Sequence, residues 1–196
     1  MSTNGSEMDP RIMRTRSSLR QALMELVTDK SFASLTIQEV TQQAGVNRST
    51  FYLHYVGMHE LLEDCIKYLF GQMRDAIYGK ASDIGSNHQK EYEPFVEIVF
   101  QHLQKHLRFY RAMLGKNGDP YFGSLFQDLL SELIFEPIGG EMRNDTESEL
   151  ILRFFTAGFT GIATWWLESN QPIHVREAAR LVTQDILPAY MRLVEG

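Results

Sequence analysis

Five side chains that can hydrogen-bond to nucleic acid occur within seven residues of this 196-residue chain. They are Arg48, Ser49, Thr50, Tyr52 and His54. An arginine guanidinium presents parallel donors that fit the edge of guanine, while hydroxyl and imidazole groups reach phosphate oxygens and other base edges. The segment therefore predicts a surface that binds DNA.

The helices that would position these side chains are short and are joined at Gly45. Thr36 and Glu39 have the spacing of a capping box, which predicts that a helix begins there. Gly45 can adopt the positive φ of a sharp helix end, and Asn47 is a good N-cap for a second helix. A helix, a glycine-containing turn and a second helix form the motif that lays a recognition helix in the major groove of DNA.

The second helix has one apolar side, formed by Phe51 and Tyr55, which are four residues apart. The polar side chains are then expected on or near the outer side. With the threonine that caps the first helix, the candidate DNA-binding residues are Thr36, Arg48, Ser49, Thr50, Tyr52 and His54. The alternative is a helical hairpin that only packs. For single residues of a DNA-binding helix, two further alternatives stay open: Tyr52 half in the core, and Ser49 or Asn47 acting only as a cap.

Two motifs in this region carry a resemblance, Ala44-Gly45-Val46 and the segment TFYLHY from Thr50 to Tyr55. Together they resemble the DNA-binding domain of the TetR family of bacterial transcriptional regulators, over about residues 14–69. The resemblance implies a homodimer that binds double-stranded operator DNA. One position departs from the family, because Met58 stands where a lysine usually opens the fourth helix and contacts phosphate.

A second resemblance covers about residues 94–190. The segment FYRAMLGKNGDP, from Phe109 to Pro120, and the later Trp165-Trp166-Leu167-Glu168 look like the regulatory domain of Firmicutes-type TetR regulators. The branch resembled includes an activator associated with dihydroxyacetone kinase operons. This implies a Gram-positive bacterial source and an unknown small-molecule effector.

The helical periodicity of the chain predicts an all-α fold, with no competing strand pattern. We expect a disordered tail at 1–10, a three-helix DNA-binding domain with the helix-turn-helix at 11–57, and a helical ligand-binding and dimerisation domain at 58–196. Further helices are expected at about 12–28, 58–78, 107–114, 121–135 and 146–168, with others from Pro94 and His174 and a loop at 79–92. The net charge of −6 divides into +1 for residues 1–58 and −7 for the rest, which gathers basic side chains at the DNA-binding end.

The expected helix at 146–168 is apolar nearly all round and has to bury two sides. Small residues such as Gly158 and Gly161 let helices approach closely. One side is expected to face its own domain and the other a partner subunit, joined by the last helix. The candidate dimer interface is Phe159, Ile162, Trp166, Leu181, Val182 and Ile186. The alternative is that these residues only complete the core of a monomer.

Two histidines, His102 and His106, lie on the apolar side of the helix expected from Pro94. Polar groups on such a face can orient a small molecule in a cavity. The candidate effector pocket is His102, His106, Phe109, Tyr110, Phe126, Phe155 and Trp165. Two alternatives stay open: histidines at a rim or hydrogen-bonded in the core, and a metal site, which their spacing suits but for which no third ligand stands nearby.

Other classes of function are disfavoured. The chain has no G-x-S-x-G, no phosphate-binding G-K-[ST] loop and no H-E-x-x-H, so we expect no enzyme, catalytic residue, cofactor or metal. A single cysteine, Cys65, excludes an internal disulfide. No signal-peptide pattern is present, and the apolar stretch 159–167 is too short to span a bilayer, so we expect a cytoplasmic protein with no membrane partner.

These expectations combine into an effector-responsive repressor that binds a palindromic operator as a dimer. The alternative is an activator, or a co-regulator of the same fold that acts through a protein partner with weak or no DNA binding. The Met58 departure favours the co-regulator.

Overall fold

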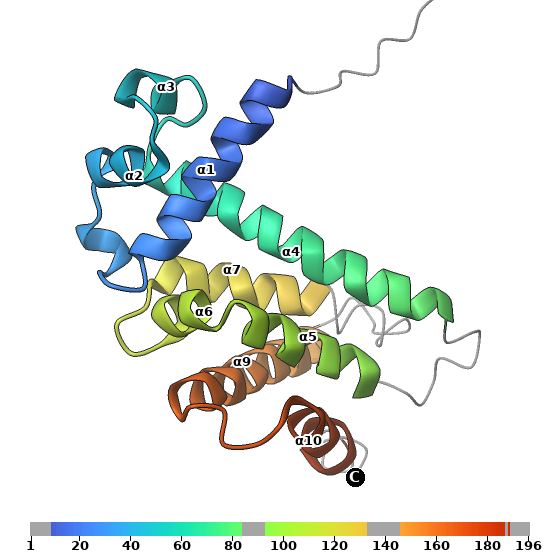
Figure 1. The fold of residues 1–196 in the computed structure, drawn as a ribbon. Coiled ribbons are helices and arrows are strands. Elements are labelled where there is room, and N and C mark those ends of the chain that lie inside the picture. The colour runs from blue at the N-terminus through green and yellow to red at the C-terminus, as the bar shows by residue number, and fades with distance from the viewer. Residues whose placement is uncertain (1–8, 84–92, 133–145, 187, 189–196) are drawn as a thin grey trace, which may run out of the picture. The chain divides into compact units, whose positions relative to one another are not determined.

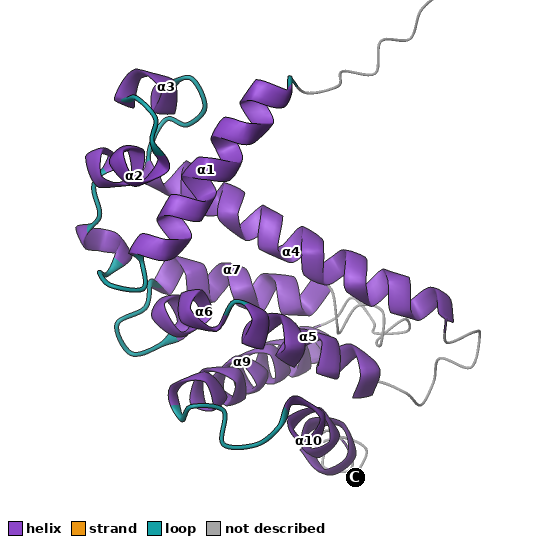
Figure 2. Ribbon diagram, in the orientation of Figure 1, coloured by secondary structure: helices purple, strands orange, loops and turns teal. Residues whose placement is uncertain are grey.

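The described residues of the computed structural model, 9–83, 93–132, 146–186 and 188, form helices and connecting loops without a strand (Figure 2). This confirms the predicted all-α fold. The chain divides into two compact units, one up to Tyr68 and one from Leu69 onward. The division falls inside a single long helix, α4 (Met58–Asp83), so this helix contributes residues to both units (Figure 1).

The first unit contains α1 (Pro10–Leu26), a 3-10 turn at Phe32–Ser34, α2 (Ile37–Ala44), α3 (Arg48–Tyr52) and the start of α4. Asp9 begins α1, because its carboxylate accepts a hydrogen bond from the Arg11 amide at 2.8 Å and Pro10 occupies the first turn. The fully buried side chains of this unit come from every helix: Leu19 and Leu23 of α1, Val40 of α2, Phe51 of α3, and Leu61, Leu62 and Cys65 of α4.

A carboxylate on α4, that of Asp64, joins three elements of the first unit. Arg16 Nη2 lies 2.6 Å from Asp64 Oδ1, Arg20 Nη1 lies 2.9 Å from Asp64 Oδ2, and the Tyr55 hydroxyl donates to Oδ2 at 2.7 Å. Partial burial raises the pKa of Asp64, but the hydrogen bonds from Tyr55 and the two arginines outweigh it, and the pKa lies below its usual value. Arg16 and Arg20 therefore neutralise an internal acid. The charge count along the sequence assigned these two arginines to the DNA-binding end. It therefore overstated the positive charge that is available for DNA.

The second unit contains the rest of α4, α5 (Glu93–Lys105), α6 (Leu107–Leu114), α7 (Pro120–Leu130), α9 (Thr146–Glu168) and α10 (Val175–Arg180), which continues as a π-helical turn at Leu181–Ile186. Its core is rich in aromatic side chains, with Phe100, Tyr110, Phe122, Phe126 and Trp166 fully buried. The Trp166 ring packs edge-on against Phe100 at 5.3 Å, and its indole nitrogen donates to the Ile173 carbonyl at 2.8 Å.

The FYRAMLGKNGDP segment forms a corner that fixes α6 against the end of α9. Arg111 Nε donates to the Leu167 carbonyl at 2.8 Å, and a Glu168 carboxylate oxygen accepts from the Lys116 amide at 2.9 Å. A Cβ atom on Gly118 would lie 2.3 Å from the Met113 carbonyl oxygen, so only glycine fits there. This motif is therefore required for packing, whatever else it does.

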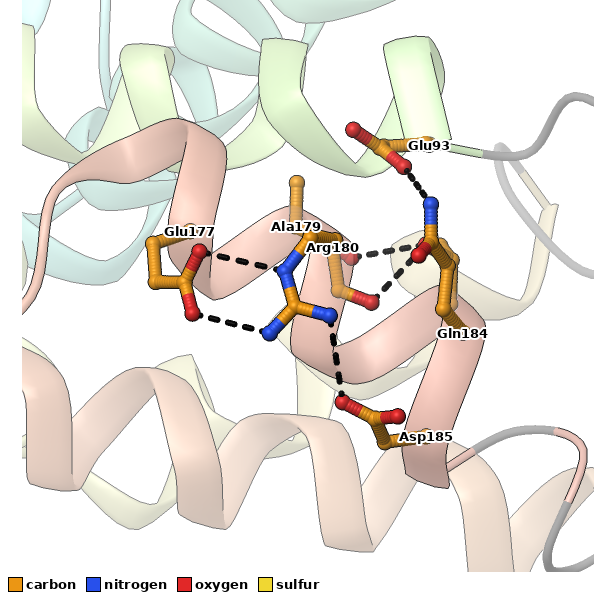
Figure 3. Close-up of polar contacts among 7 residues, drawn as sticks. Glu93, Glu177, Ala179, Arg180, Gln184 and Asp185 are labelled. Carbon is orange, nitrogen blue, oxygen red and sulfur yellow. Dashed lines mark hydrogen bonds and ion pairs between the residues drawn. The ribbon is translucent and has the colours of Figure 1, made fainter.

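A polar network attaches the last described helix to the start of α5 (Figure 3). Arg180 makes two hydrogen bonds to Glu177, at 2.9 and 3.1 Å, and approaches Asp185 at 3.5 Å. Gln184 donates to Glu93 at 2.6 Å. These contacts hold the π-helical turn in place beside α5.

Element boundaries follow the sequence closely where caps and breakers mark them. Helix α6 and the span of α9 match the predicted 107–114 and 146–168. The loop predicted at 79–92 is wrong for its first five residues, because α4 continues to Asp83; one glycine inside a helix costs only about 1 kcal/mol, which a long helix tolerates. The start of the predicted tail, 1–8, and the predicted end of α7 at Phe135 lie outside the described residues.

Replacing Asp64 with asparagine should destabilise the first unit by about 2 kcal/mol at pH 7, the scale of hydrogen bonds to a charged group. Because the folded state lowers the pKa of Asp64, its stabilisation is complete above the unfolded value near 3.9 and is lost as the pH falls through the folded value. Denaturant unfolding followed by circular dichroism should therefore show that the difference in the free energy of unfolding between the parent and Asp64→Asn becomes smaller below about pH 4. The control is Asp75→Asn, a substitution at an exposed position of the same helix, which should leave the stability unchanged. A loss of stability as large as that of Asp64→Asn would contradict the account.

Candidate nucleic-acid interface

The two helices that frame the interface meet as the sequence predicts. The Thr36 hydroxyl accepts from the Glu39 amide at 3.3 Å, and the Glu39 carboxylate accepts from the Thr36 amide at 2.9 Å, which completes the capping box. An ion pair with Lys30, and the bonds from Thr36, lower the pKa of Glu39 to about 2, so this cap stays ionised. Gly45 ends α2 at φ 66°, in the left-handed region.

Helix α3 turns one side to the core and one side to solvent. Phe51 is fully buried and Tyr55, just after the helix, is nearly so. Arg48, Ser49 and Tyr52 are exposed on the opposite side. The Arg48 guanidinium lies beside the Tyr52 side chain. Arg48 Nη2 is 3.2 Å from the Tyr52 hydroxyl, and Arg48 Cζ is 5.7 Å from the centre of the Tyr52 ring. The arginine and the tyrosine thus present their donors together.

The remaining predicted residues lie at the margins of this surface. Thr50 and His54 are half-buried, and Thr36 is exposed but uses its hydroxyl within the capping box. Asn47 occupies the N-cap position of α3, but its side chain makes no capping hydrogen bond. The polar groups of Arg48, Ser49 and Tyr52 are therefore the most available for a ligand.

Sequence reasoning missed one residue of this surface. Leu53, at the C-cap of α3, exposes 81% of its surface, and Val56, in the following turn, exposes 88%. Leu53 lies four residues after Ser49 and so shares the outer side of α3 with it. The four-residue spacing from Ser49 could have identified Leu53 as part of this surface. It was overlooked because only polar side chains were considered.

The start of α4 lacks a side-chain cap at Gly57, as its sequence suggests. Instead Glu60 reaches back and accepts a hydrogen bond from the Val56 amide at 2.6 Å. Met58 is the first residue of α4 and is half-buried. The position that carries lysine in the resembled family thus has no cation here.

The candidate effector residues fall into two groups in the second unit. His102, Phe109, Tyr110 and Phe126 are buried together, and His102 Nε2 lies 3.0 Å from the Tyr110 hydroxyl. Burial, followed by the neighbouring His106 and Lys105, lowers the pKa of His102 to about 3, so it is neutral at physiological pH. His106 Nε2 is buried with no hydrogen-bond partner among the described residues.

The other two pocket candidates are placed differently. Phe155 is half-buried on α9, and Trp165 is 51% exposed, so it does not join the buried histidine cluster. No group of three potential metal ligands occurs within the described residues.

The adjacent tryptophans of α9 lie on different sides of the helix, one buried and one exposed. Trp166 and Phe159 face the protomer core, with 0% and 5% of their surface exposed, so neither has the exposed area that a subunit contact needs. Trp165 lies on the outer side of the helix. Trp166 and Phe159 were expected in the dimer interface and Trp165 in the pocket; the protomer buries the first two in its core and leaves Trp165 at its surface, because neighbouring residues on a helix point about 100° apart.

Comparison with known proteins agrees with this geometry. Residues 19–65 match the family described as bacterial regulatory proteins, tetR family, and residues 90–186 match the family described as transcriptional regulator C-terminal region. The chain belongs to the TetR family. It is a transcriptional regulator with a helix-turn-helix DNA-binding domain, and members of this family are regulators rather than enzymes.

Individual TetR-family relatives support the same fold. The HTH-type transcriptional regulator YxbF of Bacillus subtilis is 36% identical over 62 residues, which are 31% of this chain and only 16% of that protein. The TetR regulator of Streptococcus agalactiae 2603V has a TM-score of 0.66 at 22% identity, over 88% of this chain and 93% of that one. The dihydroxyacetone kinase operon activator DhaS has a TM-score of 0.57 at 17% identity, over 91% and 97% of the two chains.

Partners are known for the family as a whole. TetR-family proteins bind operator DNA as dimers and respond to small-molecule ligands. Among the described helices, none combines the length and the hydrophobicity needed to cross a bilayer.

Restoring the missing cation should strengthen DNA binding. We expect Met58→Lys to tighten binding and to steepen its dependence on salt by about one counterion, because the ammonium group would add one phosphate contact. The measurement is a titration of duplex DNA at several salt concentrations. Ala76→Lys, which adds the same charge at an exposed position farther along α4, should change neither quantity; equal effects of the two substitutions would contradict a specific role for position 58.

Proposed function

We propose that this TetR-family protein binds a palindromic operator as a homodimer in the bacterial cytoplasm, and that a small-molecule effector releases it, so that it acts as a repressor. The observation that carries the proposal is the outer side of α3, where Arg48, Ser49 and Tyr52 are exposed together. Arg48 has no acidic partner among the described residues, so its charge is available to a phosphate or a guanine edge.

The dimer proposal is supported by an exposed apolar stripe along α9. Leu150, Phe154, Gly158, Gly161 and Trp165 follow one another at intervals of three or four residues and are all exposed. Such spacing places them on one side of the helix. The glycines allow close approach, and the large side chains at each end supply apolar area. A second copy of α9 is therefore the natural partner for this stripe.

We propose that the turn after α10 adds to this interface. Leu181 and Val182 are half-buried, and Ile186 is exposed, in the turn after α10. Ile162 is half-buried at the margin of the α9 stripe. Two helical segments from each subunit would form a four-helix interface, which is how many helical dimers bury apolar area.

The effector is proposed to bind beside the buried histidines of the second unit. The unpaired His106 Nε2 offers a hydrogen bond that no described protein group uses. The His106 ring lies 4.8 Å from that of His102, which lies 5.7 Å from the ring of Tyr110, and Tyr110 lies 5.8 Å from Phe126. Neutral imidazole and phenol groups recognise polar atoms on an otherwise apolar molecule. Because α4 belongs to both units, a displacement of its second half would reach the helix-turn-helix through the same helix.

A second candidate function is a co-regulator or activator that works through a protein partner. Its support is Met58 in place of a phosphate-binding lysine. A gel shift with the promoter DNA beside its own gene separates the two, because a co-regulator of this kind would show weak binding or none.

Loss of Arg48 should remove specific binding. We expect Arg48→Ala to weaken operator affinity at least tenfold, since each base contact made by an arginine contributes about 1–3 kcal/mol and a dimer makes two. The gel shift measures it, with circular dichroism to confirm folding. Arg153→Ala, an equal loss of charge at an exposed position of α9, should leave affinity unchanged. Parent-like affinity of Arg48→Ala would overturn the assignment of α3.

Placing a charge in the α9 stripe should separate the subunits. Trp165→Asp would bury an unpaired carboxylate in the proposed interface, which is strongly unfavourable. Because Trp165 is exposed in the protomer, the variant should still fold. Sedimentation at micromolar concentration should give a dimer for the parent and a monomer for the variant, while Tyr78→Asp, at an exposed tyrosine of α4, should remain dimeric. A monomeric parent would contradict the dimer, and a dimeric Trp165→Asp would place the interface elsewhere.

A further inference from the structure

An apolar side chain occupies the outer side of the proposed recognition helix. Leu53 exposes 81% of its surface, among the highest values for large hydrophobic side chains of the described residues. Ser49, four residues earlier, lies on the same side of the helix, and the exposed Tyr52 and Arg48 lie farther round it. The Leu53 backbone is helical, with φ −73° and ψ −19°, and its amide donates to the Thr50 carbonyl at 3.2 Å, so the helix still fixes its direction.

The packing of the first unit does not need this leucine. The core side of α3 is filled by Phe51, which is fully buried, and by Tyr55, whose hydroxyl is bound to Asp64. An exposed leucine held on a short, anchored helix is therefore available to a ligand rather than to the core. Single exposed apolar residues are common on protein surfaces, so position and chemistry have to supply the argument.

The position selects one apolar group on DNA. A helix in the major groove meets donors and acceptors on every base pair, but only thymine presents a hydrocarbon group there, its 5-methyl. The Arg48 guanidinium can pair with guanine, while the hydroxyls of Ser49 and Tyr52 can satisfy phosphates or other base edges. Leucine can form no hydrogen bond, so its favourable contact in this groove is with a methyl group.

We propose that Leu53 reads a thymine 5-methyl group in each operator half-site. The contact gives specificity at one A·T pair by burying two apolar groups from water. This inference rests on the proposed operator binding and adds the base that the leucine selects.

Replacement of thymine by uracil tests the contact atom by atom, because uracil lacks only the methyl group. Duplexes enriched from a random library by the full-length protein would be synthesised with uracil at one thymine position of both half-sites at a time. We expect one position at which uracil weakens binding by the parent about fourfold per half-site, the effect of one methyl group left in water. Leu53→Ala should bind the thymine duplex more weakly than the parent and should not distinguish uracil from thymine there.

Val56→Ala is the matched control, because Val56 is apolar and even more exposed but follows the turn after α3. It should keep the full preference of the parent for thymine. The inference is overturned if no thymine position is sensitive to uracil, or if Leu53→Ala retains the preference. If the parent and Leu53→Ala bind every duplex equally, the inference is also overturned. Leu53 would then be a candidate for contact with a protein partner. If the library yields no enriched sequence, operator binding itself fails, which is a different result from an operator without methyl readout.

Discussion

The carboxylate of Asp64 is the contact on which the DNA-binding unit depends. Helix α3 has only five residues, and so short a helix is not stable by itself. It is held from its core side by Phe51 and, through the Tyr55 hydroxyl, by Asp64, which also binds Arg16 and Arg20 of α1. One acid thus connects α1, α4 and the end of α3. The outer side of α3 is then presented in a fixed direction without having to contribute to folding.

Helix caps and turn residues close in sequence define the helix-turn-helix, so the sequence predicted this motif well. The capping box of Thr36 and Glu39 and the left-handed Gly45 are set by residues close in sequence, so spacing alone specified them. The Asp64 junction joins residues 44 and 48 positions apart, and nothing in the local pattern links them. Counting charges along the sequence therefore credited Arg16 and Arg20 to a DNA surface, although they serve the interior.

Helix α9 shows a second limit of sequence patterns. This helix is apolar on two sides. The spacing of its apolar residues shows how far apart the two sides lie, but it does not show which side packs against the core of the protomer. That choice depends on contacts with distant segments, such as Phe100 and the Ile173 carbonyl, which both engage Trp166. The sequence therefore did not predict that Trp166 is buried in the protomer core and Trp165 is exposed. Leu53 was overlooked for a different reason, since only polar side chains were considered as candidates for the DNA-binding surface.

The most direct test of the proposed function is a methylation-interference footprint on DNA bound from the promoter beside its gene. Methylation of guanine N7 blocks the acceptor that an arginine in the major groove would use. The account predicts interfering guanines in two groups, related by a two-fold axis and about one helical turn or a multiple of it apart, as a dimer of recognition helices requires. Interference confined to a single asymmetric group, or binding insensitive to every N7 methylation, would contradict it.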